Sequence, residues 1–371
     1  MDTKTEKKVV TRFPPSPTGK MQLGNARTAL FNYLFAKHYG GSFLFRFEDT
    51  DRERSKVEYE SDILESMKWL GLKADNDTPW HQSERSDIYR SYLKKLVDTG
   101  HAYVSKEADQ PQKTDASYTA HKQEGERRAE VIRFKNPNKS ITFTDLIRGD
   151  ITFDTTELGD FVIAKSMEEP IYHLAVVVDD AEMGITHVIR GEDGISNTPR
   201  QILIQEALGF SRPTYAHLPL ILAPDRTKLS KRKGAIPVSE YRASGYLSEA
   251  VVNYLALLGW NPGDDRELFS LEELVHEFDL AKVQKSGAIF NVEKLKWFNK
   301  EYLKKEGVGG SADVLSIFPE SFLAGKSERQ KETLANIVFD RISVQADLST
   351  MKESGEFSYL FTDPAYDRSA L

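Results

Sequence analysis

The sequence predicts an α/β protein with a doubly wound parallel sheet, an α+β insert and an all-helical C-terminal part. Three observations support this fold class. Strand-like and helix-like segments alternate over about the first 70 residues. The alternation breaks after about residue 100, where polar and short strand-like segments follow. From Val238 onward, hydrophobic residues recur almost wholly at helical spacing.

Composition sets the first limits on function. The chain has 371 residues, enough for two or three domains of about 150 residues each. Its 57 acidic side chains outnumber its 50 basic ones, which excludes a uniformly positive surface but not a local basic patch. The lack of cysteine excludes disulfides, cysteine nucleophiles and thiolate metal sites. The polar N-terminus and the short apolar runs lead us to expect a cytoplasmic protein that does not enter a membrane.

Alternating elements open the chain. Val9–Phe13 is short and apolar, as in a buried strand, and a loop rich in proline follows it. Apolar residues at helical spacing predict a helix over Asn25–Tyr39. Ser42–Phe47 predicts a second strand, and Val57–Leu70 predicts a second helix. This order is typical of a Rossmann-type sheet, in which helices cross between parallel strands.

The middle of the chain departs from this alternation. Residues 105–128 are polar and have no strong period, which indicates a solvated, loop-rich insertion. Strands are then predicted at Val131–Phe134, Ile141–Phe143, Ile151–Phe153, Phe161–Lys165, Leu174–Val178, His187–Arg190 and Leu218–Leu222, with a helix at Pro199–Leu208. We expect five units: a split catalytic domain at 1–100 and 174–237, an insert at 101–173, and helical domains at 238–310 and 311–371.

The first candidate site is Arg12–Leu30, which runs from a strand through a Pro/Gly loop into a helix. Free amides and the positive dipole end of a helix N-terminus bind anions. Gly19 and Gly24 would let a phosphate approach the backbone closely. The alternative is a proline-stiffened turn capped by Ser16 and Thr18.

Two further segments carry charge after predicted strands. Lys228–Lys233, KLSKRK, suits charge that builds on a leaving pyrophosphate, although a solvated surface loop is the alternative. Arg190-Gly191-Glu192-Asp193 lies at a strand's C-terminal end, where open α/β sheets bind ligands. Helix-capping residues and a surface ion pair are the alternative there.

The order of these segments resembles that of class I aminoacyl-tRNA synthetases. RFPPSPTG, GNARTALFN, FRFEDTD, VIRGED…SNTPRQ and KLSKRKGA are similar to the glutamyl/glutaminyl branch, and most of all to glutamyl-tRNA synthetases. The later stretch LLGWNP…FNVEKLKWFNKEYL resembles the stem-contact domain of that family, so the resemblance covers nearly the whole chain. It implies ATP-dependent activation of glutamate and transfer of the glutamyl group to the 3′ end of tRNA(Glu).

The resemblance implies a glutamate site of five residues. Arg12 and Ser16 match residues that contact the substrate, and Glu48 matches the acceptor of its ammonium group. Tyr172 would line the amino-acid pocket. Arg190 would read the side-chain carboxylate, because a bidentate Arg–carboxylate pair favours glutamate over glutamine.

The resemblance also implies an ATP site. Lys231 would stabilise the leaving pyrophosphate, and Lys228 and Ser230 would shape its loop. ATP is expected as its Mg²⁺ complex, with no protein ligand of the metal assigned. No zinc is expected, because zinc-binding relatives use cysteines in the insert. The positions matched to ATP contacts are Gln22, Gly24, Asn25, Glu192 and Lys231, with Gln22 also counted among the catalytic residues.

Several positions depart from the family pattern. Gln22 stands where the signature has histidine, and its amide can still donate a hydrogen bond. His173 and Gly194 stand where many relatives have asparagine and histidine, and we expect His173 and His187 to be packing residues rather than ligands. The sequence also covers only part of the family's anticodon-binding module. We expect a monomer.

Two alternatives to a glutamate–tRNA ligase stay open. Glutaminyl-tRNA synthetase is disfavoured because the tail is helical rather than rich in strands. A degraded, non-catalytic tRNA-binding paralogue is favoured by Gln22 and the shortened tail, and is disfavoured by the intact KLSKR segment.

Overall fold

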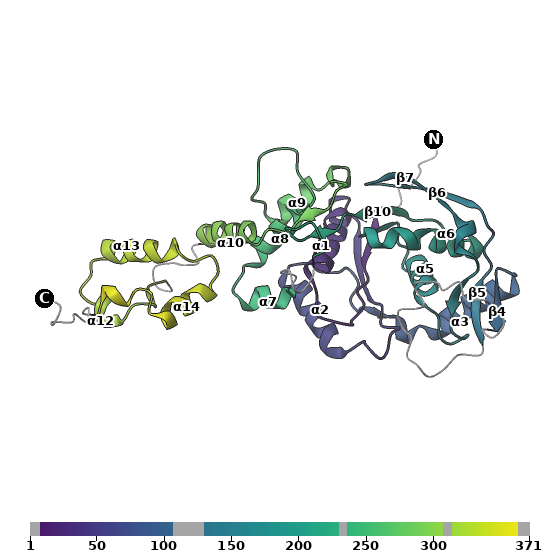
Figure 1. Cartoon of the computed structure of the whole chain (residues 1–371), viewed down its shortest axis with the longest axis horizontal. Coiled ribbons are helices and arrows are strands. Elements are labelled where there is room, and N and C mark those ends of the chain that lie inside the picture. Colours follow the sequence, from purple (N-terminus) through teal and green to yellow (C-terminus); the bar gives the residue numbers. More distant parts are fainter. Residues whose placement is uncertain (1–7, 107–129, 230–235, 307–313, 363–371) are drawn as a thin grey trace.

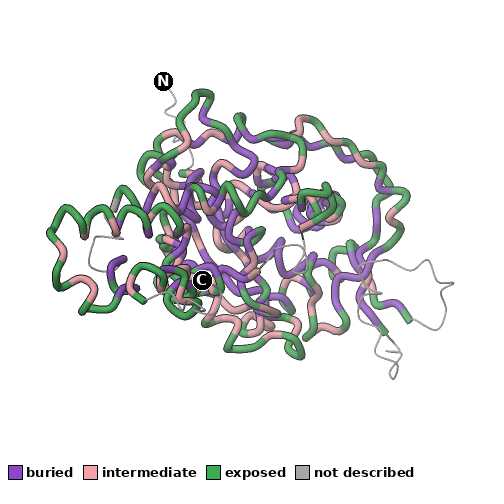
Figure 2. The backbone as a smooth tube through the Cα atoms, turned by 60° about the vertical axis from the view of Figure 1, so that its left-hand side comes forward, coloured by how far each residue is buried: buried purple, intermediate pink, exposed green. Residues whose placement is uncertain are grey.

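The computed structural model describes residues 8–106, 130–229, 236–306 and 314–362. The sheet and its helices form a rounded body, and the last helices extend from it to one side (Figure 1). Buried residues gather in the middle of that body (Figure 2). No helix within the described ranges is both long and apolar enough to cross a membrane.

A parallel sheet forms the centre of the body, as predicted. The strands β1, β2 and β3 pair in parallel, and β9 and β10 form a second parallel pair. The two groups meet where the amide of Thr186, just before β9, donates to the carbonyl of Val10 at 3.0 Å. The strand bounds are Val10–Phe13 (β1), Ser42–Phe47 (β2), Trp80–His81 (β3), His187–Gly191 (β9) and Thr214–Leu218 (β10).

Helices follow the strands as expected for a doubly wound sheet. The helix α1 leaves the loop after β1 and packs on both β1 and β2, and α2 and α3 follow β2 and β3. The helix α6 lies between β9 and β10 in the chain. The bounds are Leu23–His38 (α1), Val57–Trp69 (α2), Ser86–Asp98 (α3), Tyr172–Glu182 (α5) and Thr198–Leu208 (α6).

The expected insert contributes to two sheets. The strands β4 (Ala102–Lys106), β5 (Glu130–Phe134) and β8 (Phe161–Ala164) form a small antiparallel sheet. The hairpin of β6 (Ser140–Asp145) and β7 (Gly149–Asp154) instead extends the central sheet, because β6 pairs in parallel with β10. Most of the polar segment predicted as a loop lies outside the described residues. The division of the chain into these five segments stays a prediction.

Two predicted strands were wrong. Leu174–Val178 lies inside the helix α5, which is buried over His173–Asp180 and packs against α3, α6 and β8. A short apolar run has no period that separates a buried helix from a buried strand, so packing decided the outcome. Leu218–Leu222 is divided at Pro219: β10 ends at Leu218, and β11 (Ile221–Leu222) pairs with β12 (Ala288–Ile289).

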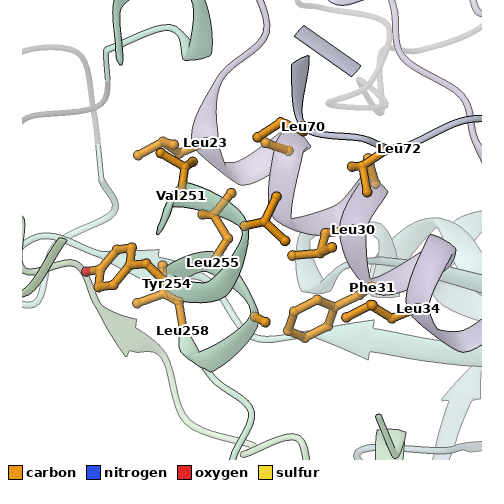
Figure 3. Packing of buried hydrophobic residues seen from close by; sticks show 14 of the residues in the cluster. Leu23, Leu30, Phe31, Leu34, Leu70, Leu72, Val251, Tyr254, Leu255 and Leu258 are labelled. Carbon is orange, nitrogen blue, oxygen red and sulfur yellow. The ribbon is translucent and has the colours of Figure 1, made fainter. Parts of the chain in front are cut away.

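The C-terminal part is helical and joins the body around the central sheet through α8, which packs on α1. Leu255 of α8 and Leu30 of α1 belong to one cluster that also holds Leu23 and Val251 (Figure 3). A second cluster, around Phe318 and Val338, forms the core of the last helices. The bounds are Val238–Ala243 (α7), Ser248–Leu257 (α8), Leu271–Glu277 (α9), Val292–Glu306 (α10), Glu320–Leu323 (α12), Glu328–Phe339 (α13) and Ala346–Ser354 (α14).

The contact between α1 and α8 predicts a large loss of stability on truncation. Leu255 is 1% exposed, so Leu255→Ala should lower the free energy of unfolding by about 2–5 kcal/mol through lost burial and a residual cavity. Urea unfolding followed by circular dichroism measures the change. Leu64→Ala is the matched control, because Leu64 is 43% exposed and its loss should cost about 0.5 kcal/mol or less. Equal effects of the two variants would contradict the packing.

Candidate active site

Charged side chains gather where the central strands end. Arg12 lies near the end of β1, Glu48 directly follows β2, and Glu192 directly follows β9. The carboxyl ends of parallel strands meet at one edge of a sheet, where ligands of open α/β folds bind. Three of the predicted residues therefore share this edge.

Arg12 and Glu48 belong to one buried cluster of charges, which also contains Arg46 and Asp180. The Nε of Arg12 donates to Oδ1 of Asp180 at 3.2 Å. Arg46 donates to Oε1 of Glu48 at 2.9 Å and to Oδ1 of Asp180 through its other terminal nitrogen. Arg46 is fully buried. Asp180 of α5 thus connects arginines on two neighbouring strands.

Burial and charge act in opposite directions on the two carboxylates. Burial raises the pKa of Glu48 above its ordinary value, although Arg46 and Arg12 oppose the rise. Burial also acts to raise the pKa of Asp180, but Arg12 and Arg46 outweigh it and the pKa lies below its ordinary value. Asp180 therefore keeps its negative charge to lower pH, and Glu48 is the carboxylate that gains a proton more readily.

Asp179 holds the other side of α5. Its carboxylate accepts hydrogen bonds from Gln82 at 2.8 Å, from Arg85 at 2.8 Å and from Tyr89 at 2.9 Å. The Nε of Arg46 lies 3.8 Å from it. Consecutive aspartates therefore tie α5 to the central sheet and to α3, which fixes the position of Asp180.

Arg190 is held mainly by neutral partners. Its Nε donates to Nε2 of His217 at 3.1 Å, and its Nη2 donates to the hydroxyl of Thr198 at 2.9 Å. Its guanidinium carbon lies 5.8 Å from the ring centre of Tyr215. A side chain at Gly194 would crowd this arrangement, because a Cβ there would lie 2.5 Å from Nε of Arg190.

Arg12 and Arg190 each have a buried nitrogen without a hydrogen-bond partner in the described part of the chain. Among the described residues, the Nη1 atom of each is buried and has no hydrogen-bond partner. Burial raises the pKa of the Tyr215 phenol, and the charges of Arg190 and Arg12 oppose that rise. Unpaired buried donors are costly unless a ligand satisfies them. The pair can therefore bind an anionic group such as a carboxylate.

The loop before α1 is open to solvent as an anion site requires. Gly24 and Asn25 in the first turn of α1 are exposed, and no acidic residue lies in that turn. A Cβ at Gly24 would meet no atom within 4 Å, so the backbone can be approached there. Ser16 is also exposed. The side-chain Nε2 of Gln22 donates to the backbone carbonyl of Lys20 at 3.0 Å, and the side chain does not cap the helix.

The acidic turn after β9 is tied to its surroundings. Glu192 accepts from the guanidinium of Arg148 and from the backbone amide of Leu220 at 3.0 Å. Lys228 is exposed in the loop after β11. Ser230 and Lys231 lie outside the described residues.

Tyr172 begins α5 and is 39% exposed, whereas the neighbouring His173 is buried. His187 is partly buried and its ring lies 5.0 Å from that of Phe35. Both observations agree with His173 and His187 being packing residues, and leave Tyr172 accessible to a ligand.

Sequence reasoning missed several residues that organise the site. Arg46 and Asp180 hold Arg12 and Glu48, and His217 holds Arg190. Arg27 of α1 is also buried, where it donates to the carbonyl of Leu258 at 3.2 Å, and burial lowers its pKa to about 10. The available signal was a charged residue within an otherwise apolar strand or helix. Such a residue is buried, and buried charged residues are almost always paired, so its position indicates a partner elsewhere in the fold.

No metal centre is evident in the part of the chain that the structure describes, where no group of three or more His, Asp or Glu side chains could hold an ion. The carboxylates of the site are instead engaged by arginines and backbone amides. Mg²⁺ with ATP, and the expected lack of zinc, stay predictions.

Comparison with known proteins places this geometry in a family. The profile of "tRNA synthetases class I (E and Q), catalytic domain" matches residues 8–119 and 105–297. A glutamate–tRNA ligase of Aquifex aeolicus is 53% identical over 322 residues, which cover 80% of this chain and 67% of the relative. A glutamate–tRNA ligase of Carboxydothermus hydrogenoformans is 48% identical over 95% of this chain and 80% of its own length.

Solved structures agree with the sequence comparison. A glutamate tRNA ligase of Elizabethkingia meningosepticum, crystallised in complex with its amino acid, has a TM-score of 0.80 and 35% identity over 98% of this chain and 82% of the neighbour. A glutamate–tRNA synthetase of Elizabethkingia anophelis has the same TM-score at 34% identity. The family profile, the curated relatives and the solved structures all match most of this chain. The chain therefore belongs to the glutamate and glutamine family of class I tRNA synthetases.

Proposed function

We propose that the chain is a glutamate–tRNA ligase. The α-carboxylate of glutamate attacks the α-phosphate of ATP, pyrophosphate leaves, and the glutamyl-adenylate then passes its glutamyl group to the 3′-terminal ribose of tRNA(Glu) with release of AMP. No protein nucleophile is needed, so catalysis consists of positioning and of stabilising charge. The relatives named as glutamate–tRNA ligases at about 50% identity support this activity.

One observation carries the choice of glutamate: the two buried arginines with unpaired Nη1 atoms. A dicarboxylic amino acid brings two carboxylates and one ammonium group. Arg190 suits the side-chain carboxylate, and Arg12 would contact the substrate as the family resemblance implies. Glu48, held by Arg46, suits the ammonium group. The exposed Tyr172 and Ser16 complete the proposed amino-acid site.

The proposed ATP site lies at the start of α1. The open backbone at Gly24 and Asn25 suits phosphate oxygens, because free amides of a helix N-terminus bind anions. Gln22 and Glu192 would contact the nucleotide at its two sides. Mg²⁺, when bound with ATP, would neutralise part of the phosphate charge. Lys231, with Lys228 and Ser230, would stabilise the leaving pyrophosphate.

The remaining parts suit the tRNA. We infer that the insert binds the acceptor stem and that the helices beyond residue 238 contact the stem and part of the anticodon arm. We also infer that the ligase acts as a monomer in the cytoplasm. The division of labour among domains follows the family resemblance.

ATP–pyrophosphate exchange with glutamate, run with and without tRNA(Glu), tests the activity. We expect exchange that depends on glutamate when tRNA is present. Exchange with glutamine instead would indicate a glutaminyl-tRNA synthetase. No exchange with either amino acid, together with tRNA binding, would indicate a non-catalytic tRNA-binding protein. The second and third outcomes would each overturn the proposal.

Replacing the proposed pyrophosphate lysine should slow activation. Lys231→Ala should lower the exchange rate by about 10²–10³-fold, the usual cost of losing one donor to transition-state charge. The KM values for glutamate and ATP should change much less. Lys73→Ala, at an exposed lysine on the surface, is the control and should leave the rate unchanged. A fully active Lys231→Ala protein would remove this lysine from the mechanism.

Replacing Arg190, the residue proposed to bind the side-chain carboxylate, should lower the activity with glutamate more than the activity with glutamine. Arg190→Ala should cost about 2–5 kcal/mol in kcat/KM for glutamate, because one partner of a desolvated charge pair is lost. The kcat/KM for glutamine should fall less, so discrimination should shrink. Arg90→Ala removes an exposed arginine and serves as the matched control. If the glutamate kinetics barely change, Arg12 becomes the reader of the side chain.

The raised pKa of Glu48 predicts a pH dependence. Glu48 gains a proton at a higher pH than an ordinary glutamate, because burial disfavours its charge. As the pH falls, Glu48 should therefore lose its charge earlier than an ordinary glutamate does, and the KM for glutamate should rise with that loss. Glu48→Gln should show a KM raised by about 10- to 100-fold even at neutral pH, with the acid rise absent. An unchanged acid rise in this variant would assign the titration to another group.

A further inference from the structure

A chain of hydrogen bonds runs behind Arg190, away from its unpaired Nη1. The Nε of Arg190 in β9 donates to Nε2 of His217 in β10 at 3.1 Å. The Nδ1 of His217 lies 2.7 Å from Oδ2 of Asp145, the last residue of β6. The side chains of His217 and Asp145 are fully buried. Three strands from distant parts of the sequence therefore meet in one polar network.

The network fixes the proton positions. An arginine Nε–H can only donate, so Nε2 of His217 must accept. A neutral imidazole then carries its proton on Nδ1, which donates to the carboxylate of Asp145. The other oxygen of Asp145 accepts from the backbone amides of Ile147 at 3.0 Å and Arg148 at 2.9 Å, so the carboxylate itself is held in place.

A second contact removes the remaining freedom of the guanidinium. Its Nη2 donates to the hydroxyl of the buried Thr198 at 2.9 Å, and that hydroxyl lies 3.2 Å from the carbonyl of Gly194. The guanidinium group is planar, so fixing Nε and Nη2 also fixes the direction of Nη1. Nη1 is buried and has no hydrogen-bond partner among the described residues, so it is the nitrogen of this guanidinium that is left to donate to a bound carboxylate.

We propose that Asp145 and His217 are positioning residues that orient Arg190 toward the side-chain carboxylate of the amino acid, and so set the preference for glutamate. This inference rests on the proposed ligase activity. His217 acts through Arg190 and touches no substrate. Its neutrality matters as well: a neutral acceptor leaves the positive charge of Arg190 available to the incoming carboxylate, whereas a carboxylate in the same place would neutralise it.

The charges around His217 support a neutral ring. Asp145 faces it from β6, Arg190 from β9 and Arg148 from the turn after β6, and the ring of Tyr215 stacks on it at 6.1 Å. Burial lowers the pKa of His217, and Arg190 adds to this effect while Asp145 opposes it. Protonation at acidic pH would replace the acceptor at Nε2 by a donor and release Arg190.

Steady-state exchange kinetics with tRNA present test the positioning role. His217→Leu should raise the KM for glutamate by about 10- to 100-fold, the loss expected for a hydrogen bond to a charged group, with the KM for ATP nearly unchanged. His217→Gln should restore most of the affinity, because a glutamine oxygen can accept from Arg190. Asp145→Asn should lie between them. His187→Leu, the same change in the neighbouring strand, should behave as the wild type.

The tautomer of His217 gives a second readout that does not depend on activity. Nitrogen-15 NMR of the eight histidines in the full chain should show one ring with a protonated Nδ1 and an unprotonated Nε2. That signal should vanish in His217→Gln. A protonated Nε2 on His217 would overturn the inference whatever the kinetics of the variants.

The two levels of proposal fail in different ways. A wild-type protein without glutamate-dependent exchange would reject the ligase activity, and the NMR result would still decide whether His217 accepts from Arg190. An active wild type, with an unchanged KM for glutamate in His217→Leu, would reject the positioning role alone. Equal rises in the KM values for glutamate and ATP would show a general structural defect and would also reject it.

Discussion

The burial of Arg46 is the constraint on which the site depends. A fully buried guanidinium needs partners that offset the loss of hydration, and for Arg46 the carboxylates of Asp180, Glu48 and Asp179 supply them from a loop and from α5. Asp180 also binds Arg12 of β1. One carboxylate therefore sets the spacing between two strands and a helix. Loss of any member would leave its partners buried and uncompensated, so the cluster tolerates little change.

Arg12 and Arg190, the two arginines proposed to bind the substrate, are supported in opposite ways. Arg12 is paired with a carboxylate, which offsets its charge. Arg190 is held by a neutral imidazole and a hydroxyl, which leave its charge available. The positive charge of Arg12 is therefore partly neutralised, whereas that of Arg190 is not. This asymmetry suits a substrate whose two carboxylates have different tasks, one being activated and the other only recognised.

The helical part of the chain helps to position the start of α1, where the ATP site is proposed. Arg27 of α1 donates to the carbonyls of Leu258, after α8, and of Pro219, after β10. The amide of Val238 donates to the carbonyl of Met21, directly before α1, at 2.9 Å. Together with the packing of α8 on α1, these contacts hold the open first turn of α1 from the side of the C-terminal helices. The proposed ATP site is thus built by both halves of the chain.

Local patterns in the sequence determined much of this protein. The alternation of apolar strands and amphipathic helices predicted the parallel sheet, and the ordered blocks placed Arg12, Glu48 and Arg190 at strand ends, because those features depend on neighbouring residues. Tertiary packing decided the rest. Leu174–Val178 became a helix because it is buried among α3, α6 and β8. The pairing of Arg12 with Asp180 spans 168 residues, and that of His217 with Asp145 spans 72. Such partners are chosen by strand order and burial, which no local pattern contains.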